Sequence, residues 1–201
     1  MIVDSAAVSS NAFYAVMLQA IIPRPIAWVL TRNPDDSFNV APFSFYNGVS
    51  AEPPVLMISV GWKDDGVRKD TWTNIVERND FVVHVPPADM VAEMVATSAP
   101  LAHGVSELEH AGLGTVPVEG EALPRIDGPR AAFFCTRREI VEVGEQAVIF
   151  GTVRKIWVDD GAARVENGRV IVDAAALAPL TRLGGKLYGE LGRLFEMERP
   201  K

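Results

Sequence analysis

Alternation of apolar and polar positions predicts strands along most of the chain. Short runs rich in Val, Ile, Phe and Trp are bounded by Pro, Asn or Gly, which is the pattern of strands that end in turns. Two longer runs are joined at Gly144-Glu145-Gln146 and predict a hairpin. The expected strands cover residues 26–31, 38–46, 55–61, 81–85, 131–143, 147–158, 170–172 and 194–198.

Helical spacing is confined to short segments. Residues 11–19 are expected to form one helix, and a second is expected to begin at Asp70 or Thr71, either of which would cap it, and to run to Arg78. A third is expected after residue 86. The apolar positions expected on their buried faces are Trp72, Ile75 and Val76 in the second helix and Met90, Met94 and Val95 in the third.

The order of these elements indicates the fold class. Strands dominate, βαβ alternation is missing, and no GxGxxG follows a strand, so a Rossmann domain is disfavoured. We expect a mainly β (α+β) protein, a barrel of mostly antiparallel strands with a few peripheral helices, in one domain over residues 1–201. Residues 101–130, rich in Gly, Pro, Glu and His, are expected to be a weakly structured insertion.

Composition narrows the function classes. A net charge of −7 disfavours nucleic acid as a partner. The apolar run 55–60 is far shorter than the ~20 residues of a membrane span, and residues 1–13 lack the features of a signal peptide, so we expect a cytoplasmic protein without a membrane partner. The single cysteine, Cys135, fits a reducing compartment and is expected to be a small buried residue rather than a catalytic thiol.

Residues 38–60 combine strand spacing with an unusual polar bend. Ser44, Asn47, Gly48 and Ser50 lie between apolar positions and before the turn at Pro53-Pro54. Small hydroxyl, amide and glycine positions let a flat ligand approach the backbone and exchange hydrogen bonds with it. The alternative is a tight hairpin whose turn residues satisfy only one another.

The sequence Lys69-Asp70-Thr71 stands where a helix is expected to begin. Free N–H groups at a helix start, a lysine and a hydroxyl together suit an anion such as a phosphate. An ordinary capped helix with a solvated lysine is the alternative. A carboxylate repels phosphate, so Asp70 is expected to serve as the cap or to orient Lys69 or Arg68.

At this point the chain resembles the flavin reductase-like proteins, which bind FMN on a split β-barrel. No single block of the resemblance is specific, but their order is, and together they span nearly the whole chain. The blocks are PRPIAWV (23–29), NVAPFSFYNGVSAEPP (39–54), KDTWTNI (69–75) and RLGGKLYGELG with FEMERP (182–200).

The resemblance implies a set of flavin-contacting residues. Lys69 and Thr71 would hold the phosphate, and the polar bend would lie along the ring. Arg24 would balance electron density on the pyrimidine side, although a surface ion pair is an equal interpretation. The full set is Arg24, Thr31, Ser44, Phe45, Asn47, Gly48, Val49, Ser50, Lys69, Asp70 and Thr71. Gln146 is a further candidate to face the ring.

The same resemblance implies an activity and partners. Hydride would pass from NADH or NADPH to FMN, with FAD as an alternative flavin, and no protein nucleophile or metal would be needed. A homodimer is implied, for which exposed Trp62 and Phe13 would suit the contact, and a monooxygenase is a candidate partner for reduced flavin. The rival interpretation is a non-enzymatic electron-transfer flavoprotein.

Other chemistry finds little support in the residues. The three histidines show no metal-binding spacing, and the role of His84 within a strand stays open. A hydrolase with Ser44 or Ser50 as nucleophile lacks a GxSxG elbow. A pyridoxamine-phosphate oxidase-like protein would share the barrel, but the four blocks match it less well.

Overall fold

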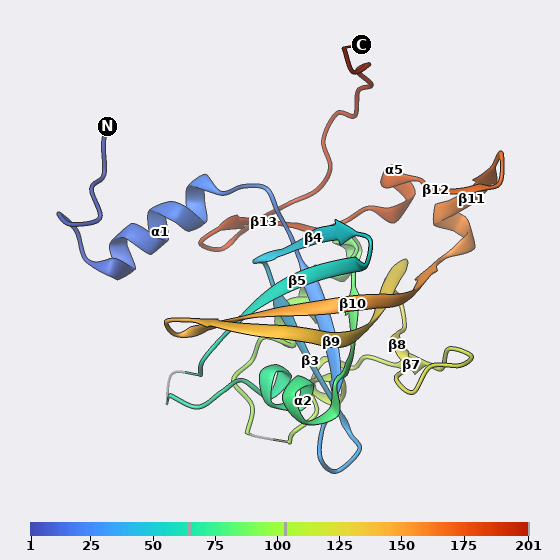
Figure 1. Ribbon diagram of the computed structural model, residues 1–201, viewed down its shortest axis with the longest axis horizontal. Helices are drawn as coiled ribbons and strands as arrows, with labels where there is room; N and C mark the ends of the chain where they lie inside the picture. The colour runs from blue at the N-terminus through green and yellow to red at the C-terminus, as the bar shows by residue number, and fades with distance from the viewer. Residues whose placement is uncertain (64–65, 103, 201) are drawn as a thin grey trace.

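The computed structural model describes residues 1–63, 66–102 and 104–200, and within them seven strands form the central sheet (Figure 1). Their order is β3-β2-β6-β9-β10-β5-β4, and every neighbouring pair is antiparallel. The strands are β2 (Ala27–Arg32), β3 (Phe38–Phe43), β4 (Tyr46–Ala51), β5 (Pro54–Gly61), β6 (Asp80–His84), β9 (Ala131–Val143) and β10 (Gln146–Val158). The predicted mainly antiparallel β fold is confirmed.

Short helices and strand pairs surround this sheet. The helices are α1 (Ser10–Ala20), α2 (Asp70–Arg78), η1 (Ala88–Met90), α3 (Val91–Ala96), α4 (Glu107–Ala111), η2 (Asp160–Ala162) and α5 (Ala174–Leu177). One smaller sheet has three strands in the order β1 (Arg24–Pro25), β13 (Thr181–Gly184) and β14 (Leu187–Gly189). The two strand pairs are β7 (Thr115–Val116) with β8 (Arg125–Ile126) and β11 (Ala163–Glu166) with β12 (Arg169–Val172). Helix α1, which packs against β13, and the C-terminal segment lie outside the central sheet (Figure 1). In the described ranges, no helix has the length and apolar character needed to span a membrane.

Both faces of the sheet are covered, as strand β2 shows. Alternate β2 residues enter two different core clusters: Ala27 and Val29 belong to one, and Trp28 and Leu30 belong to the other. All four are 0% exposed, which explains why β2 reads as a continuous apolar run instead of alternating.

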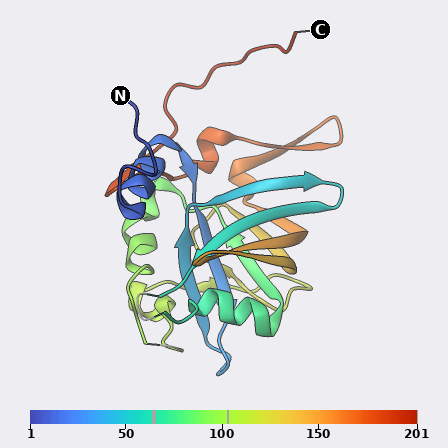
Figure 2. The ribbon, with the colours of Figure 1, turned by 60° about the vertical axis from the view of Figure 1, so that its left-hand side comes forward.

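Helix α2 packs against the cluster that contains Ala27. Its Trp72 and Ile75 are 1% and 0% exposed, and Val76 packs at the margin of the same cluster, as the helical spacing predicted. Each fully buried side chain of this size stabilises the fold by about 2–3 kcal/mol. Figure 2 shows α2 lying across one end of the strands. This packing fixes the position of the first turn of α2 relative to the sheet.

The polar bend predicted between residues 44 and 50 is smaller than expected. Only Ser44 and Phe45 separate β3 from β4, and the following residues, including Asn47 and Gly48, pair with β5. The turn predicted at Pro53-Pro54 lies at Glu52 and Pro53, and Pro54 already begins β5. Small side chains are tolerated here because β4 is an edge strand.

Three further predictions need correction. Residues 190–200 contain no strand, because Phe195 and Met197 are exposed and no neighbouring strand pairs with them. Val95 is 41% exposed although its neighbour Met94 is buried, because Met94 is the buried residue of the short helix α3 and the next position points about 100° away from it. The insertion 101–130 contains α4, β7 and β8 and is therefore more ordered than predicted.

Close packing inside the sheet requires glycine at position 151. A Cβ built on Gly151 would lie 2.4 Å from Cζ of Phe81 on β6 and 3.3 Å from Cβ of Cys135 on β9. Strand β10 also carries a register shift between Phe150 and Gly151. The missing side chain thus lets an aromatic ring of β6 fill the space beside β10.

His84, whose role the sequence left open, is a core residue. It is 0% exposed and joins three backbone segments. Its Nε2 accepts the Ile126 N–H at 2.9 Å, so Nδ1 carries the proton and donates to the Trp28 carbonyl at 3.0 Å. Burial lowers the pKa of His84 to about 4, which keeps the imidazole neutral at physiological pH.

The neutral state of His84 predicts acid sensitivity. Because the folded pKa is about 4 and the ordinary value is 6.5, the unfolded chain takes up the proton first as pH falls. We expect this residue to reduce the free energy of unfolding by about 3 kcal/mol between pH 7 and pH 4. Denaturant melts at both pH values would measure it. His84→Gln should lose that part of the pH dependence, and an equal acid sensitivity in both proteins would contradict the assignment.

Candidate functional site

A cavity of about 690 Å³ lies between β3, the start of α2 and the segment that follows α3. Its volume falls within the range of about 300–1,000 Å³ that is typical of small-molecule sites. The described walls are formed by Asn39 and residues 41–43 of β3, by residues 62–63 and 69–71, and by residues 97–102 together with Glu107. The predicted phosphate-binding residues Lys69 and Thr71, and Asp70 between them, all line this cavity.

The start of α2 forms one part of this wall. Lys69 is the N-cap residue, with extended backbone angles φ −61° and ψ 148° and no side-chain cap hydrogen bond. The predicted caps, Asp70 and Thr71, are thus wrong, because both are inside the helix with their side chains turned to other partners. The first N–H groups of a helix have no partner within it, and they carry its positive dipole end. The Lys69 ammonium lies 5.8 Å from the centre of the Phe43 ring.

The carboxylate of Asp70 is offset by a cation. Lys63 Nζ lies 2.7 Å from Asp70 Oδ1, and the Asp70 side chain is only 7% exposed. Arg68 has other partners. Its Cζ lies 4.6 Å from the centre of the Trp72 ring, and its Nη2 lies 3.2 Å from Glu142 Oε1. The negative charge that seemed awkward beside an anion is therefore neutralised within the cavity wall.

A cluster of buried polar side chains lies behind this wall and joins β2, β3 and α2. Asn39 Nδ2 donates to Thr31 Oγ1 at 3.1 Å and to Thr71 Oγ1 at 3.0 Å. Asn74 Nδ2 donates to Thr31 Oγ1 at 3.0 Å and to Asn33 Oδ1 at 2.9 Å. Among the described atoms, Asn74 Oδ1 is buried without a hydrogen-bond partner. Thr31, a predicted flavin residue, thus supports Asn39 and Thr71 from behind and does not line the cavity.

Arg24 has a different position from the cavity residues. It is 4% exposed, its Nε donates to Ser44 Oγ at 3.3 Å, and its Nη1 donates to the carbonyls of Leu18 and Ile21 at the end of α1. Its guanidinium lies 5.7 Å from the Phe45 ring, and burial, together with a neighbouring arginine, lowers the pKa of Arg24. The surface ion pair considered for Arg24 is wrong; the side chain fastens α1 to the bend before β4.

The remaining predicted flavin residues lie on β4. Asn47, Gly48, Val49 and Ser50 are exposed, and none of them lines the cavity. Asn47 Oδ1 accepts the Gly48 N–H at 2.9 Å, and the Ser50 hydroxyl donates to the Glu52 carbonyl at 3.2 Å. Together with Arg24, Ser44 and Phe45, they form a second group, and their contact with flavin stays a prediction.

Asn39 and Glu107 are among the cavity residues that the sequence analysis did not name as site residues. Asn39 stands in the block 39–54. An asparagine inside an otherwise apolar strand could have indicated that this position belongs to a polar site. Glu107 carried no such signal, because its partner, the Val40 N–H at 3.0 Å from Oε2, is 67 residues away in the chain. Burial raises the pKa of the Glu107 carboxyl, so the cavity holds an acid that is harder to ionise than an exposed one.

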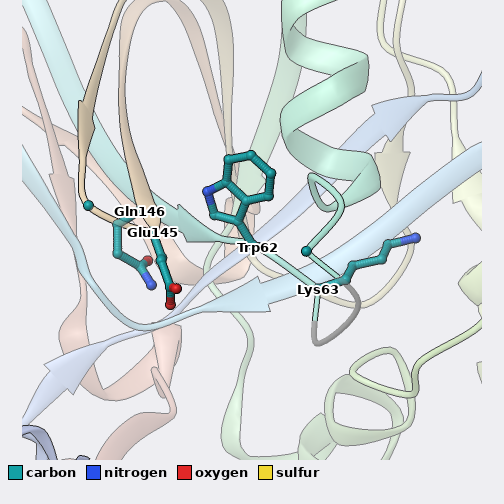
Figure 3. A pocket seen from close by; sticks show the side chains of 6 residues that line it. Trp62, Lys63, Glu145 and Gln146 are labelled. Carbon is teal, nitrogen blue, oxygen red and sulfur yellow. The ribbon is translucent and has the colours of Figure 1, made fainter. Parts of the chain in front are cut away.

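A smaller cavity of about 550 Å³ adjoins the first, with Trp62 and Lys63 in the walls of both. Figure 3 shows Glu145 and Gln146 at the tip of the β9–β10 hairpin, with the Lys63 side chain extending away from them. The Trp62 ring packs edge-on against Trp72, with centroids 5.6 Å apart. Gln146 lines this smaller cavity, where Ser59 Oγ donates to its Oε1 at 3.3 Å, and is absent from the walls of the larger one.

Nucleophilic and metal chemistry gain no support from the geometry. The Ser44 hydroxyl accepts a hydrogen bond from Arg24, and both ring nitrogens of His84 are bonded to the backbone, so His84 cannot serve as a base. Burial raises the pKa of the Cys135 thiol, which disfavours the thiolate. Within residues 1–63, 66–102 and 104–200, no three His, Cys, Asp or Glu side chains are grouped as metal ligands.

The polar cluster predicts a stability effect at the cavity wall. Asn39→Ala would remove two buried hydrogen bonds and leave Thr31 and Thr71 underpaired, so we expect the free energy of unfolding to fall by about 2 kcal/mol. Denaturant unfolding would measure the change. The matched variant Asn47→Ala, on the exposed edge strand, should change it by less than about 0.5 kcal/mol. Equal effects of the two substitutions would contradict a structural role for the cluster.

Comparison with known proteins places this architecture. A family model described as flavin reductase like domain matches residues 18–175. The uncharacterised YwrF of Bacillus subtilis is 36% identical over 198 residues, covering 96% of this chain and 95% of its own. A second uncharacterised relative, from Halalkalibacterium halodurans, is 38% identical and covers 93% and 90% of the two chains.

Solved structures agree with the family match. Nitrilotriacetate monooxygenase component B from Bacillus cereus superposes with a TM-score of 0.90 at 30% identity over 98% of both chains. The 2-nitrobenzoate 2-nitroreductase NbaA of Pseudomonas fluorescens gives 0.89 at 25% identity, covering 100% of this chain and 96% of its own. A Shewanella frigidimarina chain, named for a split barrel domain, gives 0.84 at 16% identity over 100% of both chains and confirms the predicted split β-barrel. The chain therefore belongs to the flavin reductase-like family.

Proposed function

We propose that this protein binds FMN in the larger cavity and is an NAD(P)H-dependent flavin oxidoreductase. The observation that carries the proposal is one cavity in which the cationic start of α2 meets the wall of β3, in a chain of the flavin reductase-like family. FAD is the alternative flavin.

The residues of the cavity fit a phosphorylated flavin. Lys69, the first N–H groups of α2 and the Thr71 hydroxyl form the anion-binding end. The Lys63–Asp70 pair removes the charge conflict at that end. The backbone and apolar side chains of residues 41–43 provide a wall for a flat ring. Behind the wall, Asn74 and Asn39 both donate to Thr31 Oγ1, and Asn74 Oδ1 is buried without a hydrogen-bond partner among the described residues, so an ordered water would extend the polar network there.

In this reaction the protein's own residues would bind the flavin, position it and exclude water. The chemistry supplied by a bound flavin is the acceptance of hydride from NADH or NADPH and its passage to a further acceptor. Lys69 would hold the phosphate, Asn39 and Thr71 would fix the position of the α2 start, and residues 97–102 would exclude water from the cavity. No protein nucleophile is required by this reaction, which agrees with the buried, bonded state of His84 and the protonated Cys135.

The predicted flavin residues on β4 are outside the cavity, and a second copy of the chain would explain their role. Val49 is 52% exposed on β4, and α1 has no buried residue although its Tyr14, Val16 and Met17 are apolar or aromatic and at least 40% exposed. An apolar helix of this length gains stability mainly by packing, so we propose that α1 and β4 contact a second copy in a homodimer. In that arrangement the predicted contacts of residues 44–50 would be made across the dimer interface. Trp62 and Phe13 were expected to suit this contact. Trp62 is 36% exposed with its ring edge-on to Trp72, Phe13 is half-buried, and their part in the contact stays a prediction.

The main alternative concerns how the flavin exchanges electrons with other molecules. One similar protein is a monooxygenase component and another is a nitroreductase, so reduced flavin would serve a partner monooxygenase or a small bound acceptor in the cytoplasm. A non-enzymatic electron-transfer flavoprotein would use the same cavity but would not react with nicotinamide. Addition of NADH or NADPH to the FMN-loaded protein under nitrogen separates the two, because only the reductase loses its yellow absorption within seconds. A colourless protein that shows no spectral change on FMN addition would overturn the flavin assignment.

Lys69 is predicted to contribute to flavin affinity. Lys69→Ala removes a charged donor from the phosphate end, and FMN binding should weaken by about 1–3 kcal/mol. A fluorescence titration of FMN measures this change. The matched variant Lys186→Ala, an exposed lysine outside the cavity, should bind FMN as the original chain does. Unchanged affinity in Lys69→Ala would remove Lys69 from the site.

The proposed dimer predicts a change of mass on substitution. Met17→Glu places a charge on the apolar surface of α1, and we expect the protein to become monomeric in analytical ultracentrifugation. Val165→Glu, on the exposed β11–β12 hairpin, serves as the control and should remain dimeric. A monomeric original chain at micromolar concentration would contradict the dimer.

A further inference from the structure

Glu107 and its neighbour Ser106 pair with the free edge of the sheet. Strand β3 is an edge strand, so its outward N–H and C=O groups have no strand partner. Glu107 Oε2 accepts the Val40 N–H at 3.0 Å, and the Ser106 hydroxyl donates to the Phe38 carbonyl at 2.7 Å. This pair of residues, called the clasp below, thus supplies one acceptor and one donor, as a neighbouring strand would.

The clasp holds one end of the cavity roof. Residues 97–102, called the roof segment, line the cavity, and Glu107 lines it as well. The other end is fixed at Thr97, whose hydroxyl accepts the Trp28 Nε1–H at 2.9 Å and donates to the Met94 carbonyl at 2.7 Å. The roof segment is therefore tied to β2 at Thr97 and to β3 through the clasp.

The hydrogen bond from the Val40 N–H is the main polar interaction of the Glu107 carboxyl among the described residues. Within the described residues no lysine or arginine lies within ion-pair distance of it, and Lys63, a cation of the same cavity wall, is paired with Asp70. Leu108 packs into the core beside it at 6% exposure, so α4 remains anchored to the sheet when the carboxyl is changed. The carboxyl can thus be tested without removing the packing of its helix.

We propose that Glu107 is a positioning residue whose clasp on β3 holds the roof segment over the bound ligand and thereby sets how long the ligand is retained. The proposal rests on the proposed function, because FMN is the ligand used to test it. Glu107 acts through the backbone of β3 and through the roof segment, and it takes no part in hydride transfer.

Dissociation of FMN and amide exchange test this role together. Stopped-flow dilution of the FMN-loaded protein should show release about tenfold faster in Glu107→Ala, the effect expected when one hydrogen bond to a charged group is lost. Glu107→Gln keeps an acceptor oxygen and should stay within about threefold of the original rate. In the ligand-free protein, hydrogen exchange at the Val40 amide should accelerate about tenfold in Glu107→Ala and much less in Glu107→Gln. Glu109→Ala removes an exposed carboxylate from the same helix and is the matched control.

The outcomes separate this proposal from the flavin assignment. An original chain that binds no FMN overturns the proposed function, and the retention role falls with it. Normal FMN binding with equal release from Glu107→Ala and Glu109→Ala overturns the role of Glu107 alone, and so does a Gln variant that fails to restore slow release. If Glu107→Ala does not fold, Ser106→Ala removes the other half of the clasp and should release FMN about threefold faster; an unchanged rate there also overturns the proposal.

Discussion

The position of the α2 start depends on a small set of buried hydrogen bonds. Asn39 joins Thr31 of β2 to Thr71 of α2, and Asn74 returns from α2 to Thr31. Leaving any of these groups unpaired in the interior costs about 1–3 kcal/mol, so the three elements are held in one arrangement. The cationic end of the cavity, the wall of β3 and the first turn of α2 are consequently fixed relative to one another before any ligand is present.

Much of the fold could be predicted from the chain, because local patterns determine it. The apolar runs in residues 131–143 and 147–158 with a glycine turn between them became the β9–β10 hairpin, and the spacing of Trp72, Ile75 and Val76 marked the buried face of α2. Residues 194–198 show the limit of this reasoning. Their apolar pattern is that of a strand, but a strand forms only where a neighbour supplies backbone partners, and that information is not local.

The candidate site was predictable only in part, for a related reason. Lys69 and Thr71 were found because a helix start is visible in sequence and has known electrostatics. Glu107 was missed because its role depends on a β3 backbone group brought near by the fold. The bonds from Arg24 to the final carbonyls of α1 could not be predicted either, because the pattern around Arg24 says nothing of that helix. A side chain's partner across the tertiary structure cannot be deduced from its neighbours in the chain.

The two edges of the sheet differ in a way that limits assembly. Along β3 the outward backbone groups of Phe38 and Val40 are already satisfied by side chains, whereas β4 at the opposite edge is exposed. Joining unlike edges head to tail, the geometry that grows into fibres, would need both of them open. With those β3 groups occupied, strand pairing at β4 is favoured only between like edges about a twofold axis, an arrangement that would close on itself after two subunits.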